Sequence, residues 1–206
     1  MIKILGRANS INVQKVMWCA AELGVQVARA DIGGPFGGND TQDYLGKNPN
    51  GKIPTLVEDE FTLWESNAIV RYLCEKHGTR PWYPEQLTDR AHANQWMDWY
   101  LTTLHPFMTV IFWQLIRTAP EDRDAEAVQS ARDAAASFWT ILDGHLSNTD
   151  FLIGDEPSMA DIPVGCAAYR WHEMDIDRPN LKHLKSWSKR LTDRAAYRQH
   201  VMLPLT

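Results

Sequence analysis

The 206-residue sequence contains few cysteines and no surplus of positive charge. Its three cysteines, Cys19, Cys74 and Cys166, lie far apart, which fits neither a disulfide framework nor a paired set of zinc ligands. Free thiols are typical of reducing compartments, so a cytoplasmic location is expected. Lysines and arginines number 21 against 26 aspartates and glutamates, and the net charge of −5 argues against a nucleic-acid partner.

The sequence also lacks a long apolar segment. The longest stretch without a charged residue lies within residues 101–116 and is interrupted by His105, Pro106 and Gln114, whereas a membrane-spanning helix needs about 20 apolar residues. The first six residues are typical of a short strand and not of a signal peptide. We therefore expect no membrane partner.

Several nucleotide and metal motifs are absent as well. The pairs Gly46-Lys47 and Gly51-Lys52 are not followed by Ser or Thr, so neither forms a phosphate-binding loop. His172-Glu173 lacks the second histidine of a zinc-protease helix, and residues 175–177 lack the rest of a calcium loop. No Cys-x-x-Cys pair occurs. The sequence predicts no metal site and no bound cofactor.

Residues 1–80 alternate between strand and helix signals. Val13, Val16 and Ala20 recur at helical spacing before Gly24, and residues 33–38 contain too much glycine for regular structure. Strands are expected at residues 2–5, 25–32, 55–57 and 61–63, and helices at 13–23, 41–45 and 66–77. This order predicts a small α/β domain.

Beyond Thr88 the strand signals disappear and apolar residues recur at helical spacing. Helices are expected at residues 88–117, 121–146, from Ser158 onward and from about Pro179 onward. Because an interior proline removes a backbone hydrogen bond, Pro106 predicts a bend in the first of them. Residues 76–87 predict a linker, so an all-helical domain at 88–206 would follow the α/β domain at 1–80.

One motif carries more specific information. Asn48-Pro49-Asn50-Gly51-Lys52-Ile53-Pro54-Thr55-Leu56 is followed by Glu65-Ser66-Asn67-Ala68-Ile69. This combination resembles the glutathione-binding motif of the soluble glutathione S-transferases. Residues 10–16 resemble the first loop and helix of their serine-type and bacterial members, in which a serine or an asparagine contacts the sulfur. The resemblance covers the whole chain and implies a thioredoxin-like N-terminal domain, an all-helical C-terminal domain and a homodimer.

The resemblance assigns glutathione, a co-substrate, to residues whose physical chemistry agrees with it. A cis Ile53-Pro54 bond would leave the peptide groups of Ile53 free for an extended peptide. The helix N-terminus at Ser66 favours the γ-glutamyl carboxylate, and Glu65 suits the α-amino group. The alternative is a plain turn and a plain helix cap. Residues 33–46 lack Lys and Arg, so Lys52 with Asn39 would hold the glycyl carboxylate, and affinity for glutathione would be low.

Ser10 is the first candidate for contacting the glutathione sulfur, and Asn12 is the second. A free thiol has a pKa of about 8.5, so a hydroxyl and helix amides that favour its anion make it a better nucleophile at pH 7. The alternative is that Ser10 or Asn12 only caps the helix.

The second domain would supply the pocket for a hydrophobic electrophile. Candidate lining residues are His105, Met108, Phe112 and Trp113, although aromatic residues at helical spacing more often form a core. The leading function is conjugation of glutathione to hydrophobic electrophilic small molecules. The alternatives are a glutathione-dependent disulfide reductase or peroxidase and a non-catalytic binding module of the same fold.

Overall fold

Residues 1–206 are all described by a computed structural model. The N-terminal part comprises β1 (Ile2–Leu5), α1 (Ile11–Glu22), β2 (Val27–Ala30), a 3-10 turn (Gly34–Phe36), α2 (Gln42–Leu45), β3 (Thr55–Glu58), β4 (Phe61–Trp64) and α3 (Ser66–His77). The sheet order is β2-β1-β3-β4, with β1 parallel to β2 and antiparallel to β3. This βαβ-ββα arrangement is a thioredoxin-like domain, as predicted.

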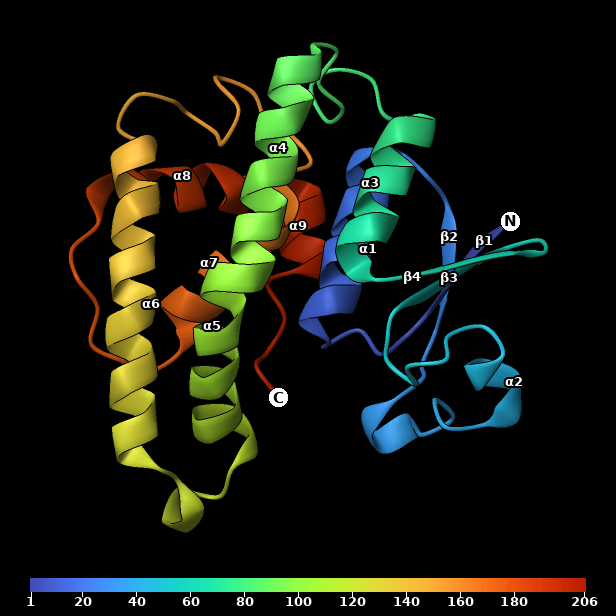
Figure 1. The fold of residues 1–206 in the computed structure, drawn as a ribbon, viewed down its shortest axis with the longest axis horizontal. Helices are drawn as coiled ribbons and strands as arrows, with labels where there is room; N and C mark the ends of the chain where they lie inside the picture. The colour runs from blue at the N-terminus through green and yellow to red at the C-terminus, as the bar shows by residue number, and fades with distance from the viewer.

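Alternating burial explains how the sheet and its helices pack. Ile2 and Ile4 of β1 are buried while Lys3 between them is exposed, as period-two alternation requires. α1 and α3 pack against each other and lie between the sheet and the helical part of the molecule (Figure 1). The loop that joins β1 to α1 and the start of α3 therefore lie at the boundary of the two parts.

The C-terminal part is entirely helical. It comprises α4 (Leu87–Trp99), a π-helical turn (Tyr100–Leu104), α5 (His105–Phe112), a second π-helical turn (Trp113–Arg117), a 3-10 turn (Pro120–Asp122), α6 (Ala125–His145), α7 (Asp161–Glu173), α8 (Lys182–Thr192) and α9 (Ala195–His200). In Figure 1, α4, α5 and α6 form the long antiparallel arm of this part, and α7 runs behind them.

Residues 88–117 were expected to form one α-helix bent at Pro106; the chain changes direction where α4 passes into α5 (Figure 1), but it is not one α-helix. Two π-helical turns divide it, and at the first one the His105 amide donates to the Tyr100 carbonyl, five residues back. A wider turn before the proline accommodates its missing amide and its ring without breaking the helix. This is the physical reason for the difference.

Other boundaries differ by a few residues. Glu65 occupies the N-cap position of α3, so Ser66 is the first helical residue and not the cap. The predicted helix at 121–146 begins at Ala125, because the Asp124 side chain accepts a hydrogen bond from the Ala127 amide. The helix expected near Pro179 begins at Lys182, and α9 was not predicted.

A buried hydrogen-bond network holds the start of α7. The helix itself begins at Asp161, three residues later than predicted. The Asp161 carboxylate accepts hydrogen bonds from the amides of Ser158 at 2.8 Å and Leu152 at 3.2 Å, and from the Trp187 indole at 2.8 Å. The Ser158 hydroxyl accepts from the Ala160 amide at 3.3 Å. This buried network ties α7 to α8 and to the loop before it.

One hydrophobic core runs through both parts of the molecule. α1 packs on α7 and α9. At Gly165 of α7 a Cβ would lie 3.0 Å from Trp18 of α1 and 2.7 Å from Leu191 of α8. Arg194 adds an ion pair with Glu22 at 2.6 Å. The relative position of the two parts, and of the cleft between them, therefore rests on close packing.

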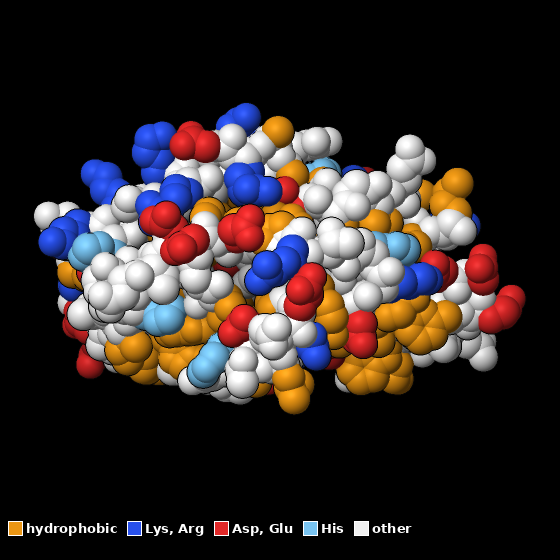
Figure 2. Space-filling model, turned by 90° about the horizontal axis from the view of Figure 1, so that it is seen from above, with side chains coloured by type: hydrophobic (Ala, Val, Ile, Leu, Met, Phe, Trp, Pro, Cys, Tyr) orange, Lys and Arg blue, Asp and Glu red, His pale blue; other side chains and the backbone are white.

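The surface shows no large separation of charge on the face drawn in Figure 2, where acidic and basic side chains intermingle. No helix is both long and apolar enough to cross a membrane. No group of three or more His, Cys, Asp and Glu side chains is arranged to hold a metal ion.

Candidate active site

A cavity of about 600 Å³ lies where the N-terminal domain meets α5. Its walls come from the loop after β1, the glycine-rich loop, the entry to β3, the start of α3 and α5. All seven residues predicted for the catalytic group and for glutathione line it: Ser10, Asn12, Asn39, Lys52, Ile53, Glu65 and Ser66. The fold thus brings together residues that are up to 56 positions apart.

The entry to β3 presents a free peptide edge. The Ile53–Pro54 bond is cis, as predicted. The preceding carbonyl, of Lys52, accepts hydrogen bonds from the Tyr44 hydroxyl at 2.6 Å and the Asn48 amide at 2.7 Å. The amide and carbonyl of Ile53 take part in none of the backbone hydrogen bonds of the loops and turns. The hydrogen bonds to the Lys52 carbonyl therefore hold the entry to β3 in place, while the peptide groups of Ile53 stay free to pair with an extended ligand.

Glu65 carries an exposed carboxylate on a strained backbone. Its φ of 69° and ψ of 111° lie in a region that side chains rarely adopt. The carboxylate forms neither a cap hydrogen bond nor an ion pair in the protein. This backbone conformation places the Glu65 carboxylate beside the first turn of α3. The carboxylate has no partner in the protein there, and its charge suits a ligand ammonium group.

A buried lysine lies beneath the site, and the sequence analysis missed it. Lys15 is fully buried, and its Nζ donates to Asn12 Oδ1 at 2.9 Å and to Ser66 Oγ at 3.4 Å. The Ser66 hydroxyl also donates to Asn12 Oδ1, at 3.2 Å. Nζ lies 4.7 Å from the centre of the Tyr100 ring. Burial lowers the pKa of Lys15 to about 8.

This network fixes the orientation of the Asn12 amide. Because its oxygen accepts from Lys15 and Ser66, its nitrogen is the atom without a protein partner. Ser10 differs: it occupies the N-cap position of α1, but its hydroxyl makes no cap hydrogen bond. Neither side chain has the plain capping role considered above. Both offer a free donor at the start of α1.

The residues predicted for the electrophile, His105, Met108, Phe112 and Trp113, line a second cavity of about 300 Å³. Ser10 and Asn12 line both cavities, so the two meet at the candidate catalytic groups. Trp96 and Trp99 lie elsewhere and pack edge to face, with ring centres 5.1 Å apart. Trp113 is 59% exposed, so it forms the rim of the second cavity and not part of the core.

His105 is placed as a hydrogen-bonded neutral group. Its Nδ1 lies 2.9 Å from the Tyr100 hydroxyl and its Nε2 lies 3.4 Å from the Thr109 hydroxyl. Burial, with the charges of Lys15 and Arg170, lowers the pKa of His105 to about 4. The imidazole is therefore uncharged at neutral pH and lacks the proton of a general acid.

The smaller cavity is less apolar than predicted, because Arg7, Arg117 and Arg170 also line it. Local sequence gives no signal for this cluster, since its members come from distant segments. Lys15 had a signal: it is the only charged residue of α1 before its last residue, Glu22. In the larger cavity, Asn39 binds the Gly51 carbonyl at 2.8 Å, so its amide nitrogen anchors the loop, while Lys52 remains exposed.

The three cysteines lie outside both cavities and are buried. Cys19 and Cys74 have their sulfur atoms 3.5 Å apart, and the Cys74 contact and burial raise the pKa of Cys19 well above its ordinary value. Cys19 therefore packs in the core as an inert thiol, in keeping with its position among apolar neighbours.

Fold and site together define a thioredoxin-like protein with an added helical domain and a cleft suited to an extended peptide that carries charges of both signs. Comparison with known proteins gives the same result. The family models for the N-terminal and C-terminal domains of glutathione S-transferases match residues 2–75 and 102–195. The chain belongs to the glutathione S-transferase family, and it is an enzyme.

Individual relatives cover the whole chain. Glutathione S-transferase GstB of Escherichia coli K12 is 36% identical over 208 aligned residues, with 100% of both chains covered. A theta-class glutathione S-transferase of Xanthomonas axonopodis pv. citri, solved with glutathione bound, has a TM-score of 0.96 and 42% identity and covers 100% of this chain and 99% of its own. Dichloromethane dehalogenase of Methylophilus leisingeri is 32% identical over 71% of this chain and 58% of its own.

Proposed function

We propose that this enzyme conjugates the thiolate of glutathione to electrophilic small molecules. The observation that carries the proposal is the meeting of the two cavities at Ser10 and Asn12. In the larger cavity, the tripeptide would pair with Ile53, place its γ-glutamyl carboxylate at Ser66 and its amino group at Glu65. Lys52, with Asn39, would face the glycyl carboxylate.

The proposed chemistry is nucleophilic displacement. Glutathione loses its thiol proton to solvent, the sulfur forms a bond to carbon, and the leaving group departs with the bonding electrons. The Ser10 hydroxyl donates to the thiolate, and the amides at the start of α1 favour the same negative charge. The name of one relative, dichloromethane dehalogenase, supports a halide as the leaving group.

The two alternatives have less support. A cysteine-type reductase needs a reactive thiol in the cleft, and the residue there is Ser10, while Cys19, Cys74 and Cys166 are buried. A non-catalytic binding module has no need for the free carboxylate that Glu65 presents on a strained backbone. Parallel assays separate the three functions. Conjugation to 1-chloro-2,4-dinitrobenzene is expected, whereas thiol transfer to a mixed disulfide alone, or glutathione binding without turnover, would contradict the proposal.

The role of Ser10 is tested against that of Asn12. Ser10→Ala is expected to raise the pKa of bound glutathione by about one to two units, or roughly 1.4 to 2.7 kcal/mol, with binding nearly intact. Asn12→Ala leaves Lys15 with one hydrogen-bond partner fewer, so its main effect is expected on stability, of about 1 kcal/mol. The measurement is thiolate absorbance of the enzyme-bound tripeptide against pH. A pKa that rises only in Asn12→Ala would assign the sulfur contact to the asparagine.

Three further features complete the proposal. Residues 1–80 form the glutathione domain and residues 88–206 the helical domain that supplies the electrophile pocket. The working form is a homodimer in the cytoplasm, with no nucleic-acid or membrane partner. Sedimentation at micromolar concentration checks the assembly, because a species with the 23.6 kDa mass of one chain would contradict the dimer.

A further inference from the structure

Three arginine side chains gather around the smaller cavity. Arg7 lies in the loop after β1, Arg117 ends the second π-helical turn of the long arm, and Arg170 lies in α7. The guanidinium carbons of Arg170 and Arg117 lie 3.9 and 5.7 Å from the centre of the Phe112 ring. No aspartate or glutamate is among the residues that line this cavity. The cluster belongs to a protein whose net charge is −5, so it is a local feature.

None of the three guanidinium groups is neutralised by the protein. The ion pairs of the chain join other basic side chains. Arg7 Nε and Nη1 and Arg170 Nε are buried without a hydrogen-bond partner. Arg170 donates to the Asn9 carbonyl at 3.3 Å, and its side chain is otherwise satisfied only by the Phe112 ring. Buried donors of this kind are costly unless a ligand accepts from them.

The arginines also act on one another. Arg170 is only 8% exposed, and its pKa is lowered to about 10, mainly by burial and to a smaller extent by the charges of Arg117 and Arg7. Burial and Arg117 lower the pKa of Arg7. Like charges held together in a partly buried site repel, and an anion placed among them would relieve that repulsion.

The glycine-rich loop makes room for Arg7. Gly34 has a φ of +60°, and a Cβ at this position would lie 2.7 Å from Arg7 Nε. Any other residue at position 34 would therefore displace the guanidinium group. Gly34, one of the glycines that argued against regular structure at residues 33–38, is thus needed to leave space for the Arg7 side chain beside the cavity.

We propose that the smaller cavity binds a carboxylate on the electrophile, and that Arg7, Arg117 and Arg170 recognise it. This inference rests on the proposed function, since the cavity opens beside Ser10. Planar guanidinium groups match the two oxygens of a carboxylate. The cavity volume of about 300 Å³ and the walls formed by Met108 and Phe112 suit a small acid with an apolar body.

The other carboxylate within reach is the glycyl carboxylate of glutathione itself. Lys52 and Asn39 line only the larger cavity, whereas Arg117 and Arg170 line only the smaller one. Arg7 is the only one of these basic side chains that lines both cavities. This division favours the electrophile as the partner of the arginine cluster, and the experiment below distinguishes the two carboxylates.

The test uses two aryl chlorides that differ only in charge, 4-chloro-3-nitrobenzoate and 4-chloro-3-nitrobenzamide. In both, the thiolate attacks the carbon that bears chlorine, a carbon–sulfur bond forms and chloride leaves with the bonding electrons. Each kcat/KM is divided by the uncatalysed rate constant with glutathione, because the amide activates the ring more strongly. We expect the corrected value to be about tenfold higher for the benzoate. We also expect this preference to shrink when salt is raised to about 0.2 M.

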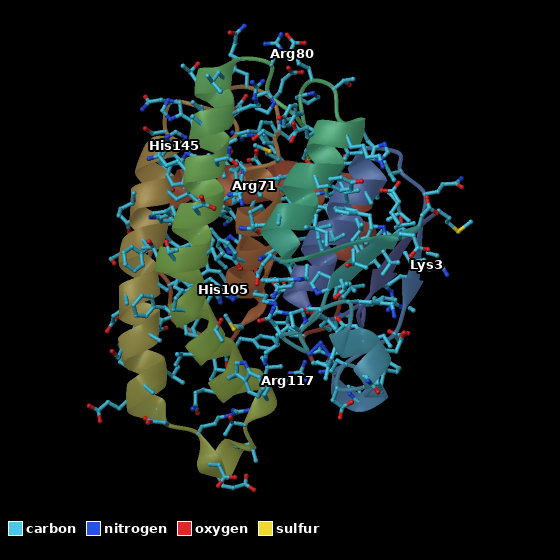
Figure 3. The ribbon with its side chains drawn as sticks, turned by 45° about the vertical axis from the view of Figure 1, so that its right-hand side comes forward. Lys3, Arg71, Arg80, His105, Arg117 and His145 are labelled. Atoms are coloured by element: carbon cyan, nitrogen blue, oxygen red, sulfur yellow. The ribbon has the colours of Figure 1, made fainter.

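The variants are Arg117→Gln and, as a matched control, Arg80→Gln. Both side chains are exposed, and Figure 3 shows Arg117 low on the long arm and Arg80 at the opposite end of the molecule. Arg117→Gln is expected to lower the ratio of the corrected kcat/KM for the benzoate to that for the benzamide about fivefold, whereas Arg80→Gln is expected to leave this ratio at the wild-type value. Arg117→Lys should restore part of the lost preference. The inference would be overturned if the wild-type ratio of corrected kcat/KM values, benzoate over benzamide, were near one. It would also be overturned if Arg117→Gln left this ratio unchanged. A raised KM for glutathione with both substrates would also overturn it, in favour of the glycyl carboxylate.

A binding measurement keeps the inference separate from turnover. Calorimetry compares S-(4-carboxybenzyl)glutathione with S-(4-carbamoylbenzyl)glutathione, and we expect the first to bind about tenfold more tightly. If neither aryl chloride is turned over but this difference is found, the proposed function fails and the anion site stands. Equal affinities of the two conjugates would refute the anion site whether or not conjugation occurs.

Discussion

Replacing Lys15 with methionine should make the protein more stable and a weaker activator of glutathione. The substitution keeps the unbranched side chain and its volume but removes a charge that is fully buried. Burial lowers the pKa of this lysine from 10.5 to about 8. Since one pKa unit corresponds to about 1.4 kcal/mol, the buried charge destabilises the fold by about 3 kcal/mol at pH 7.

Part of this gain is offset by lost contacts. Lys15 donates to Asn12 at 2.9 Å and to Ser66 at 3.4 Å, and its Nζ lies 4.7 Å from the centre of the Tyr100 ring. These contacts are worth about 1 to 2 kcal/mol together. The expected net effect of Lys15→Met on the free energy of unfolding at pH 7 is therefore an increase of about 1 to 2 kcal/mol.

The pH dependence gives a sharper test than one value. Between pH 8 and 10.5 the folded wild type binds fewer protons at Lys15 than the unfolded chain, so its stability rises with pH through this window. Lys15→Met lacks this rise. Urea unfolding from pH 6 to 10.5 should show the variant's advantage constant below pH 8 and smaller by about 3 kcal/mol at the upper limit. The exposed Lys3→Met serves as the control for general charge effects.

The activity of Lys15→Met tests whether the buried charge of Lys15 lowers the pKa of the bound glutathione thiol. Lys15 Nζ lies 2.9 Å from Asn12 Oδ1, and Asn12 lines the same cavity as Ser10. A thiolate held by Ser10 would therefore lie on the order of 8 Å from the buried ammonium group. At an effective dielectric constant of about 20, their attraction is about 2 kcal/mol. Lys15→Met should then raise the pKa of bound glutathione by about 1.5 units. A difference in stability that does not change between pH 7 and 10.5, together with an unchanged thiol pKa, would refute the reasoning.

Two further predictions concern the cleft and the core. Glu65→Gly should relieve the strain at φ 69° and raise the free energy of unfolding by about 1 kcal/mol while it raises the KM for glutathione about tenfold or more; Glu65→Gln should raise the KM alone. Steady-state kinetics measure the KM for glutathione and urea unfolding measures the stability of each variant. A normal KM in Glu65→Gln would show that Glu65 does not bind glutathione. Asp161→Ala should lower the free energy of unfolding by about 3 to 5 kcal/mol, because it leaves the buried donors of Leu152, Ser158 and Trp187 unpaired. A loss below about 1 kcal/mol in urea unfolding would contradict that role.

The long arm and the caps show where local sequence is a poor guide to structure. Pro106 correctly predicted a disturbance near residue 106, but the response of the helix depended on its packing against α6 and α7. A π-helical turn at residues 100–104 precedes the proline, which itself lies in the first turn of α5. The helix starts expected at Ser158 and near Pro179 were displaced to Asp161 and Lys182, because capping depends on which side chain the fold brings within reach.

The order of strands and helices in residues 1–80 was predictable from local sequence, since turn chemistry and hydrophobic periodicity are encoded within a few residues of each other. The candidate site residues came instead from motif segments that resemble a known family, and the fold brings these separate segments to two adjoining cavities. The buried Lys15 and the cluster of Arg7, Arg117 and Arg170 were decided only by the tertiary structure. Burial, charge proximity and a lowered pKa are properties of residues that meet in space. No spacing in the sequence shows that Arg117 and Arg170 share the ring of Phe112, because that contact exists only after α7 has packed against α5.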